Sequence, residues 1–296
     1  MSEARMPNYG GQALIEGVMM RGKSHVARAM RAPDKQIVIQ TEPLSGIYLS
    51  KITKIPFLRG LVLLWDALNL GMRAITISAN LQSGEDEKLE GFPLFLTLLT
   101  AIGLAVGLFF LLPAGIGYLF EKILQISLWW SNVIEGVMRL VILLAYLWLI
   151  GKMPEIKRVF AYHGAEHKTI NAFEANVLLT PENVATFPLE HTRCGTAFLL
   201  DVMFLSIILF SLLGPLPIEW RMLSRVLLIP VIAGIAYEYL RWTANNQELP
   251  FVQAIIKPNL ALQRLTTSEP SLDMLEVSIA SFNAMRNAEQ EEKIAL

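Results

Sequence analysis

Four apolar stretches dominate the pattern of hydrophobic and polar positions along the chain. They span about residues 94–112, 133–150, 196–213 and 222–240. The first has no charged residue, and each of the others has one or two. A helix needs about 20 mostly apolar residues to cross a bilayer, and four such helices are hard to bury in a soluble core. The pattern therefore predicts a mainly α membrane protein with about four transmembrane helices.

The polar parts of the chain follow other periodicities. Residues 26–30 and 36–40 alternate around a turn, which predicts a hairpin in a small N-terminal β-rich unit. Residues 56–80 mix apolar and charged positions, as in a helix that lies on the membrane or dips into it, although an ordinary core helix fits equally well. Residues 271–293 predict a weakly amphipathic tail helix that packs or docks a partner.

These patterns divide the chain into four parts and suggest an orientation. The parts are the β-rich unit at 1–55, the interfacial helix and linker at 56–90, the four-helix membrane region at 91–241 and the tail at 242–296. Lysine and arginine are frequent before the first stretch and in a histidine-rich loop at 151–195, whereas only Lys122 lies between the first two stretches. The positive-inside rule then predicts a multi-pass protein of the cell membrane with both termini and this loop in the cytoplasm.

Composition agrees with a membrane location and limits the partners. Of the 296 residues, 53% are hydrophobic and only 17% are charged, against about a quarter in soluble domains. The formal net charge of −1 gives no field that would attract nucleic acid, so the lipid bilayer is the expected partner. The single cysteine, Cys194, excludes a disulfide within one chain, which fits a reducing compartment.

One short motif suggests nucleotide binding, but its surroundings argue against it. Residues 17–24 fit the G-x4-G-K-S pattern of a phosphate-binding loop. Such a loop needs a helix after it, because the first amides of that helix hold the phosphates. Residues 25–33 instead alternate like a strand and end at a proline. We therefore expect no nucleotide at this position.

The histidine-rich loop carries the main candidate for chemistry. If residues 155–176 form a helix, His163 and His167 share one face, and two imidazoles at this spacing can bind zinc or a similar divalent metal. Glu166 lies beside them and could act as a general base toward a metal-activated water. The order His-x-x-Glu-His is also that of the inverted zinc proteases.

The spacing leaves the third metal ligand open. His191 is the first candidate, and further candidates are Cys194, Asp201 and Glu238. If His191 and Cys194 both joined the two histidines of the predicted helix, the metal would be four-coordinate and structural rather than catalytic. In a metal-free alternative, these histidines pair with acids as polar contacts between helices.

Five strings of the sequence resemble the YqhQ-like family of bacterial membrane proteins. These strings are residues 11–22, 162–168, 191–196, 262–267 and 276–280. The resemblance spans nearly the whole chain. Members are classed as a domain of unknown function, and some carry the label "predicted metal-dependent enzyme". That label implies a metal site based on His163, Glu166, His167 and His191.

The leading expectation is a metal-dependent membrane enzyme, a hydrolase with its site at the cytoplasmic face. It would use the histidines as metal ligands and Glu166 as the base. The competing expectation is a non-enzymatic scaffold or assembly factor, whose N-terminal unit or tail docks a protein partner and whose metal, if any, is structural. A transporter that uses Asp201 and Glu238 is a third option. The scarcity of glycine breaks in the four stretches and the lack of an evident internal repeat argue against it.

Overall fold

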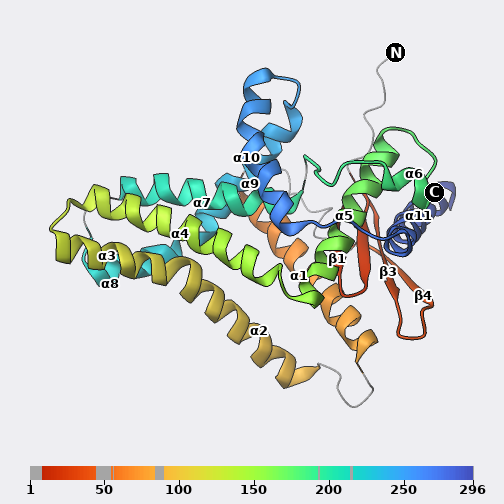
Figure 1. Cartoon of the computed structure of the whole chain (residues 1–296), viewed down its shortest axis with the longest axis horizontal. Coiled ribbons are helices and arrows are strands. Elements are labelled where there is room, and N and C mark those ends of the chain that lie inside the picture. The colour runs from red at the N-terminus through yellow and green to blue at the C-terminus, as the bar shows by residue number, and fades with distance from the viewer. Residues whose placement is uncertain are drawn as a thin grey trace.

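The computed structural model describes residues 9–44, 55, 57–83, 90–192, 194–213 and 216–295. Helices dominate, and one small antiparallel sheet comes from the N-terminal part of the chain, as the sequence predicts (Figure 1). In chain order the elements are β1 (Gly10–Leu14), β2 (Gly17–Arg21), β3 (His25–Arg31), β4 (Ile37–Pro43), α1 (Leu58–Gln82), α2 (Gly91–Val106), η3 (Gly107–Leu111), α3 (Leu112–Leu124), α4 (Leu128–Ile150), α5 (Pro154–Glu174), α6 (Pro181–Ala185), α7 (Gly195–Leu212), α8 (Ile218–Leu227), α9 (Ile229–Asn245), α10 (Pro250–Thr266) and α11 (Leu272–Ala295).

The sheet has its four strands in the order β1-β2-β3-β4. β3 and β4 form the predicted hairpin, with Arg31 opposite Ile37 beside the turn. β1 and β2 form a second hairpin that alternation did not reveal. The reason is that β2 is buried on both faces: Val18 and Met20 belong to one core, whereas Met19 belongs to the other. Strands buried on both faces read as apolar runs.

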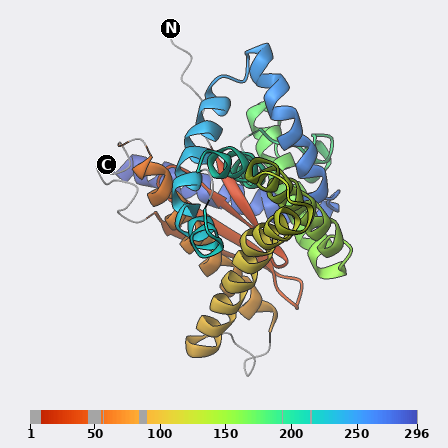
Figure 2. The same cartoon turned by 90° about the vertical axis from the view of Figure 1, so that its left-hand side faces the viewer.

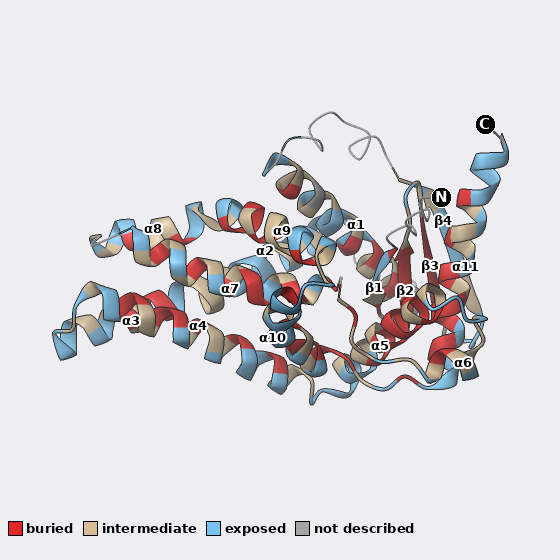
Figure 3. Cartoon of the chain, turned by 90° about the horizontal axis from the view of Figure 1, so that it is seen from above, coloured by how far each residue is buried: buried red, intermediate tan, exposed pale blue. Residues whose placement is uncertain are grey.

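Helices cover both faces of this sheet, and two of them come from distant parts of the chain. α5 and α11 share a core with one face, where Phe282 of α11 is fully buried. α1 packs on the other face through Ala74. Figure 3 shows α1 and α11 on opposite sides of the strands. The predicted tail helix at 271–293 is therefore α11, and it packs on the N-terminal sheet.

The segment that resembles a phosphate loop is a strand followed by a turn. Residues 17–21 form β2, and β3 begins at His25, so a strand and not a helix follows the motif. The turn already holds a carboxylate from α11, because Glu289 accepts hydrogen bonds from the amides of Lys23 and Ser24. The amides that would face a phosphate are thus bound to an acidic side chain.

Within the described residues, four helices are long and apolar enough to cross a membrane. They are α1, the continuous helix made of α2, η3 and α3, and helices α4 and α7. Three of the expected stretches therefore lie on long helices that extend away from the sheet in Figure 1 and lie in front of it in Figure 2. No residue of α2 is buried. An exposed apolar surface of this extent is unfavourable in water and is typical of a surface that contacts a membrane or another protein.

The fourth expected helix, at about 222–240, is not a single straight span. It falls on α8 and α9, which are bent by 44° where they meet. Pro230 lies in the first turn of α9, and a proline removes a backbone donor and clashes with the preceding turn. In addition, α1 was expected either to lie on or dip into the membrane or to be an ordinary core helix. It packs on the sheet through Ala74, as a core helix does, and it also meets the same length and composition criteria as the spans.

Helix α1 connects the apolar helices to the sheet. Near its start Arg59 forms a two-pronged ion pair with Glu238 of α9, in which Arg59 Nε lies 2.7 Å from Glu238 Oε1. Near its end Ser78 Oγ accepts a hydrogen bond from the Ile15 amide over 3.3 Å. The two contacts together fix the sheet relative to α9.

A buried cluster of charges joins the apolar helices to one another. Glu135 of α4 accepts hydrogen bonds from three arginines. They are Arg139 of the same helix at 2.8 Å, and Arg221 and Arg225 of α8 at 3.2 Å and 2.7 Å. Arg139 also donates to the Phe109 carbonyl over 2.9 Å. Phe109 belongs to η3, a π-helical turn, and such turns interrupt the usual α-helical hydrogen bonding.

We expect Glu135→Gln to destabilise the protein by about 3–5 kcal/mol, because it leaves buried arginines without their counter-charge. Glu121→Gln is the matched control. Glu121 also pairs with Arg221, but its side chain is 30% exposed, so its loss should cost less than about 1 kcal/mol. Thermal unfolding in detergent, followed by circular dichroism, measures both variants. Equal effects of the two substitutions would contradict the role assigned to Glu135.

Candidate metal centre

Helix α5 is enclosed on most sides although it is rich in polar residues. Most residues from Ala161 to Ala172 are buried, and these include Glu166, His167 and Lys168. Its apolar residues pack with the sheet and α11. Because ionisable side chains are rarely buried without partners, the polar residues of α5 mark it as the place to look for a site.

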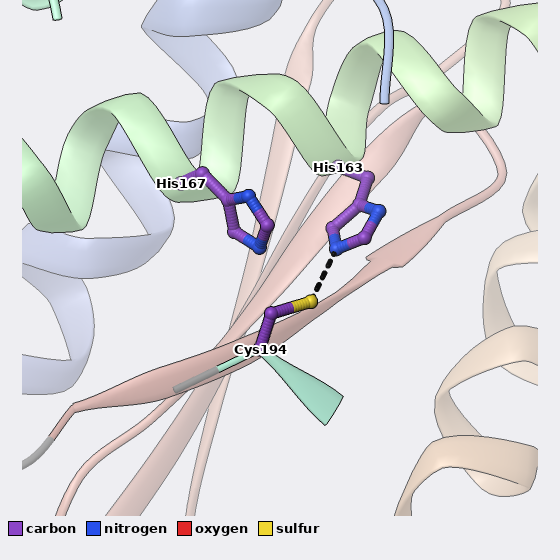
Figure 4. A group of neighbouring side chains, drawn as sticks. All are labelled: His163, His167 and Cys194. Atoms are coloured by element: carbon purple, nitrogen blue, oxygen red, sulfur yellow. Dashed lines mark hydrogen bonds between the residues drawn. The ribbon is translucent and has the colours of Figure 1, made fainter. Parts of the chain in front are cut away.

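Two histidines of α5 and the cysteine at the start of α7 point toward one another (Figure 4). One ligand atom from each of His163, His167 and Cys194 lies within 4.8 Å of the other two. The two imidazole centres are 4.4 Å apart, and His163 Nε2 lies 3.2 Å from Cys194 Sγ. The predicted helix over 155–176 is present as α5, and it brings the two histidines onto one face.

Backbone carbonyls fix the outer nitrogens of both imidazoles. His163 Nδ1 lies 2.8 Å from the Thr266 carbonyl oxygen, and His167 Nδ1 lies 2.5 Å from that of Leu189. A carbonyl oxygen only accepts, so each neutral ring carries its proton on Nδ1 and presents a lone pair on Nε2. His167 Nε2 is buried and faces Cys194, and it makes no hydrogen bond of normal geometry in the described part of the chain. Metal-binding histidines show this arrangement, in which the outer N–H donates to an oxygen.

The three side chains fit a zinc-type ion. Imidazole nitrogen and thiolate sulfur are the ligands that zinc prefers, with bonds of about 2.0–2.3 Å. Ligand atoms around a tetrahedral ion at such bond lengths lie about 3.5 Å from one another. The ligand atoms of His163, His167 and Cys194 lie up to 4.8 Å apart, so the longest of these distances would have to shorten by roughly 1 Å for all three to bind one ion. Cys194 caps α7, and its sulfur accepts a hydrogen bond from the Thr196 amide over 3.4 Å. The positive end of α7 therefore favours the negative charge of a metal-bound thiolate.

Glu166 lies beside the histidines on α5, away from solvent. Burial raises the pKa of its carboxyl group, and the nearby His163 and His191 act to lower it. Its side chain packs against Gly11 of β1, where an added Cβ atom would lie 3.0 Å from the carboxyl carbon. Glu166 Oε2 has no hydrogen-bond partner among the described residues. A carboxylate with a raised pKa is a stronger base than an exposed carboxylate.

His191, the first candidate for a third ligand, lies next to the group of three. Its ring centre is 5.7 Å from that of His167. Its backbone is held by Gln263 of α10, which accepts from the amide and donates to the carbonyl, each over 2.9 Å. Burial lowers the pKa of His191, and Glu166 acts to raise it. The structure therefore places His191 where it can influence Glu166.

The two acids considered as ligands have partners elsewhere. Asp201 follows Cys194 by seven residues on α7, about 10 Å along the helix, and it accepts a hydrogen bond from Asn259 over 3.1 Å. Glu238 pairs with Arg59 of α1. Among the candidates from the sequence, the structure groups His163, His167 and Cys194, with Glu166 and His191 beside them.

The groups that orient the histidines gave little signal in the sequence. Thr266 and Leu189 contribute backbone carbonyls, which every residue has. The connection between α10 and α11 can approach α5 because Gly164 has no side chain. A Cβ atom at that position would lie 2.3 Å from the Ser268 carbonyl oxygen. Gln263 lies in a segment of mixed polar and apolar residues, between Leu262 and Arg264, so its polarity did not mark it as part of a site.

Comparison with known proteins identifies the family of the chain. The family described as "Protein of unknown function (DUF1385)" matches residues 55–288, a range that contains α5, Cys194 and α10. The chain is also 37% identical, over 299 aligned residues, to the "Uncharacterized protein YqhQ" of Bacillus subtilis (strain 168). That alignment covers 96% of this chain and 93% of the relative. No solved structure matches. Both the extent of the family match and the identity along nearly the whole relative show that the chain belongs to this DUF1385 family of YqhQ-like proteins.

Proposed function

We propose that this protein is a metal-dependent hydrolase of the cell membrane with its site at the cytoplasmic face. The observation that carries the proposal is the convergence of His163, His167 and Cys194, in which the buried His167 Nε2 makes no hydrogen bond of normal geometry with any residue that the structure describes. The ligand set favours zinc or a similar divalent ion as the cofactor. Three protein ligands leave one position open, as a catalytic site requires.

The side chains around this group have separate roles in the proposal. A bound divalent ion would activate a water molecule and polarise the bond to be cleaved. Glu166 would accept the proton of that water, because it is buried beside the ligands and its pKa is raised by burial. The carbonyls of Thr266 and Leu189 would keep both imidazoles in the tautomer that binds metal.

The location in the proposal follows from the apolar helices. Apart from α1, which packs on the sheet through Ala74, three of the described helices are long and apolar enough to cross a bilayer: the continuous helix made of α2, η3 and α3, and helices α4 and α7. With the bent pair α8–α9 as a fourth crossing, the sheet, α5 and both termini would lie on one side, which the positive-inside rule assigns to the cytoplasm. Cys194 stands at the start of α7, which is one of the crossing helices. The site would therefore lie at the membrane surface, with the lipid bilayer as its immediate surroundings.

In a second proposal, the metal ion is bound but has a structural role, and the protein is not an enzyme. The ring of His191 is 5.7 Å from that of His167, so a side-chain movement could add it as a fourth ligand. A site filled by four protein ligands is structural. The protein would then be a scaffold or assembly factor that docks a protein partner through the N-terminal unit or the tail.

We expect the purified wild-type protein to hold about one divalent ion per chain after exhaustive dialysis. Replacing both His163 and His167 by Ala, or Cys194 by Ser, should lower zinc affinity by at least about tenfold, because each change removes a direct ligand. His25→Ala is the matched control, since His25 lies on β3 and contacts Ser24 and Glu292. Elemental analysis and zinc titration give the result, and a metal-free wild type would end the proposal.

The same titration distinguishes the two proposals through His191→Ala. A catalytic site of three ligands should keep its metal in this variant, whereas a structural site of four ligands should lose affinity. Substitution with cobalt adds an independent reading, because a thiolate-to-cobalt absorption band should appear in the wild type and vanish in Cys194→Ser.

We expect Glu166→Gln to keep the metal and lose activity by about 10²–10⁴-fold, which is the usual contribution of a general base. Activity would be followed on a panel of simple esters, amides and phosphodiesters with the metal-loaded protein. The paired measurement of metal content is essential, since it separates loss of the base from loss of the site. A variant that is as active as the wild type would remove Glu166 from the mechanism.

Glu166→Gln should also raise the melting temperature of the metal-free protein at neutral pH. Burial raises the folded-state pKa of Glu166 above its ordinary value of 4.5, so the folded protein holds this proton more tightly than the unfolded chain. The stability linked to the proton is fully present below about pH 4.5 and is lost as the pH rises through the folded-state pKa. Thermal unfolding with a chelator between pH 4.5 and 8 should show the advantage of the variant growing with pH. A constant difference would contradict this account.

A further inference from the structure

A cavity of about 300 Å³ lies between α7, α9 and α10, outside the candidate metal centre. Its walls are mostly apolar, with Phe204, Leu205 and Ile208 contributed by α7. Its polar residues include Asp201 of α7 and Asn259 of α10. The volume is at the lower end of the range for ligand-binding pockets, which suits one chain rather than two.

Asp201 gives this cavity an unsatisfied polar group. The residue is only 5% exposed. One carboxylate oxygen, Oδ1, accepts a hydrogen bond from Asn259 over 3.1 Å, whereas Oδ2 is buried and has no partner in the described part of the chain. A buried carboxylate oxygen without a donor is unfavourable. A ligand that brings a hydrogen-bond donor to Oδ2 would remove this cost.

The cavity is polar at one end and apolar at the other. Asp201 is the lining residue of α7 closest to Cys194, and Ile208 lies about 10 Å farther along the helix. Phe204 and Ile208 are 47% and 58% exposed on this long apolar helix, so the apolar end opens where hydrocarbon would lie. Figures 1 and 3 show α10 crossing α7 rather than running along it, and α10 supplies Asn259 at the polar end.

We propose that this cavity binds a membrane amphiphile with one apolar chain, whose head donates a hydrogen bond to Asp201 Oδ2. A small cation would leave the apolar wall uncovered, and a lipid without a donor in its head would leave Oδ2 unpaired. A polyol or amine head on a single acyl chain satisfies both ends. The site does not require a metal at His163, so it stands independently of the proposed hydrolase.

The test uses the full chain in nanodiscs of phosphatidylcholine, whose head has no hydrogen-bond donor. The probe is a monoacylglycerol with a photoreactive diazirine in its chain, and the comparison probe is the methyl ester of the same fatty acid. Crosslinks of the monoacylglycerol should map to the α7 segment that contains Phe204, Leu205 and Ile208. The ester should label about tenfold less, because it cannot donate a hydrogen bond to Asp201.

Three variants sharpen the result. Leu205→Trp should abolish the specific labelling by filling the cavity, and Leu199→Trp is the matched control, since Leu199 is an exposed leucine of α7 outside the cavity. Asp201→Ala should reduce labelling by the monoacylglycerol to the level of the ester. Labelling should persist after chelation, so loss of metal does not affect this test. Equal labelling by both probes, or labelling that Leu205→Trp leaves unchanged, would show bulk lipid contact only and overturn the proposal.

Discussion

The candidate site depends on the way in which the polar residues of the buried helix α5 are satisfied. Thr169 Oγ1 lies 2.8 Å from Ser278 Oγ of α11, and Lys168 Nζ donates to the Ala185 carbonyl over 2.8 Å. Two buried atoms of α5, Glu166 Oε2 and His167 Nε2, are without a partner among the described residues. One of these two atoms, His167 Nε2, belongs to the group of three ligand atoms that also includes Cys194 Sγ, which supports the proposal of a metal site on this helix.

This organisation explains why strings scattered along the chain carry the family resemblance. The string at 11–22 supplies Gly11, against which Glu166 packs. The string at 262–267 supplies Gln263 and Thr266, which hold the His191 backbone and the His163 ring. The string at 276–280 supplies Ser278, whose hydroxyl donates to the Ala165 carbonyl over 3.0 Å. The sheet and the tail helix, which look like separate units in the sequence, therefore enclose one helix.

The sequence was sufficient for features that depend on local periodicity, and insufficient for those that depend on the path of the chain. Long apolar helices, the β3–β4 hairpin and the pair His163–His167 follow from spacing alone. The β1–β2 hairpin was missed because burial on both faces removes alternation. The group of three contains Cys194 and not His191, and this choice depends on how residues 175–192 return to α5. That path is set by tertiary contacts such as those of Gln263.

The hydrogen-bond partners of a buried acid indicate whether the acid has a structural role or could bind a ligand, and three buried acids of this protein illustrate the difference. Both oxygens of Glu135 accept hydrogen bonds from arginines, so this carboxylate is complete without any further molecule. Glu166 and Asp201 each keep one buried oxygen that has no partner among the residues that the structure describes. An unsatisfied buried carboxylate opposes folding, and it is therefore a feature that stability alone would not maintain. Because Glu166 lies beside three metal-type ligands and Asp201 lines an apolar cavity, the two acids suit different occupants: activated water for one, and the head of a lipid for the other.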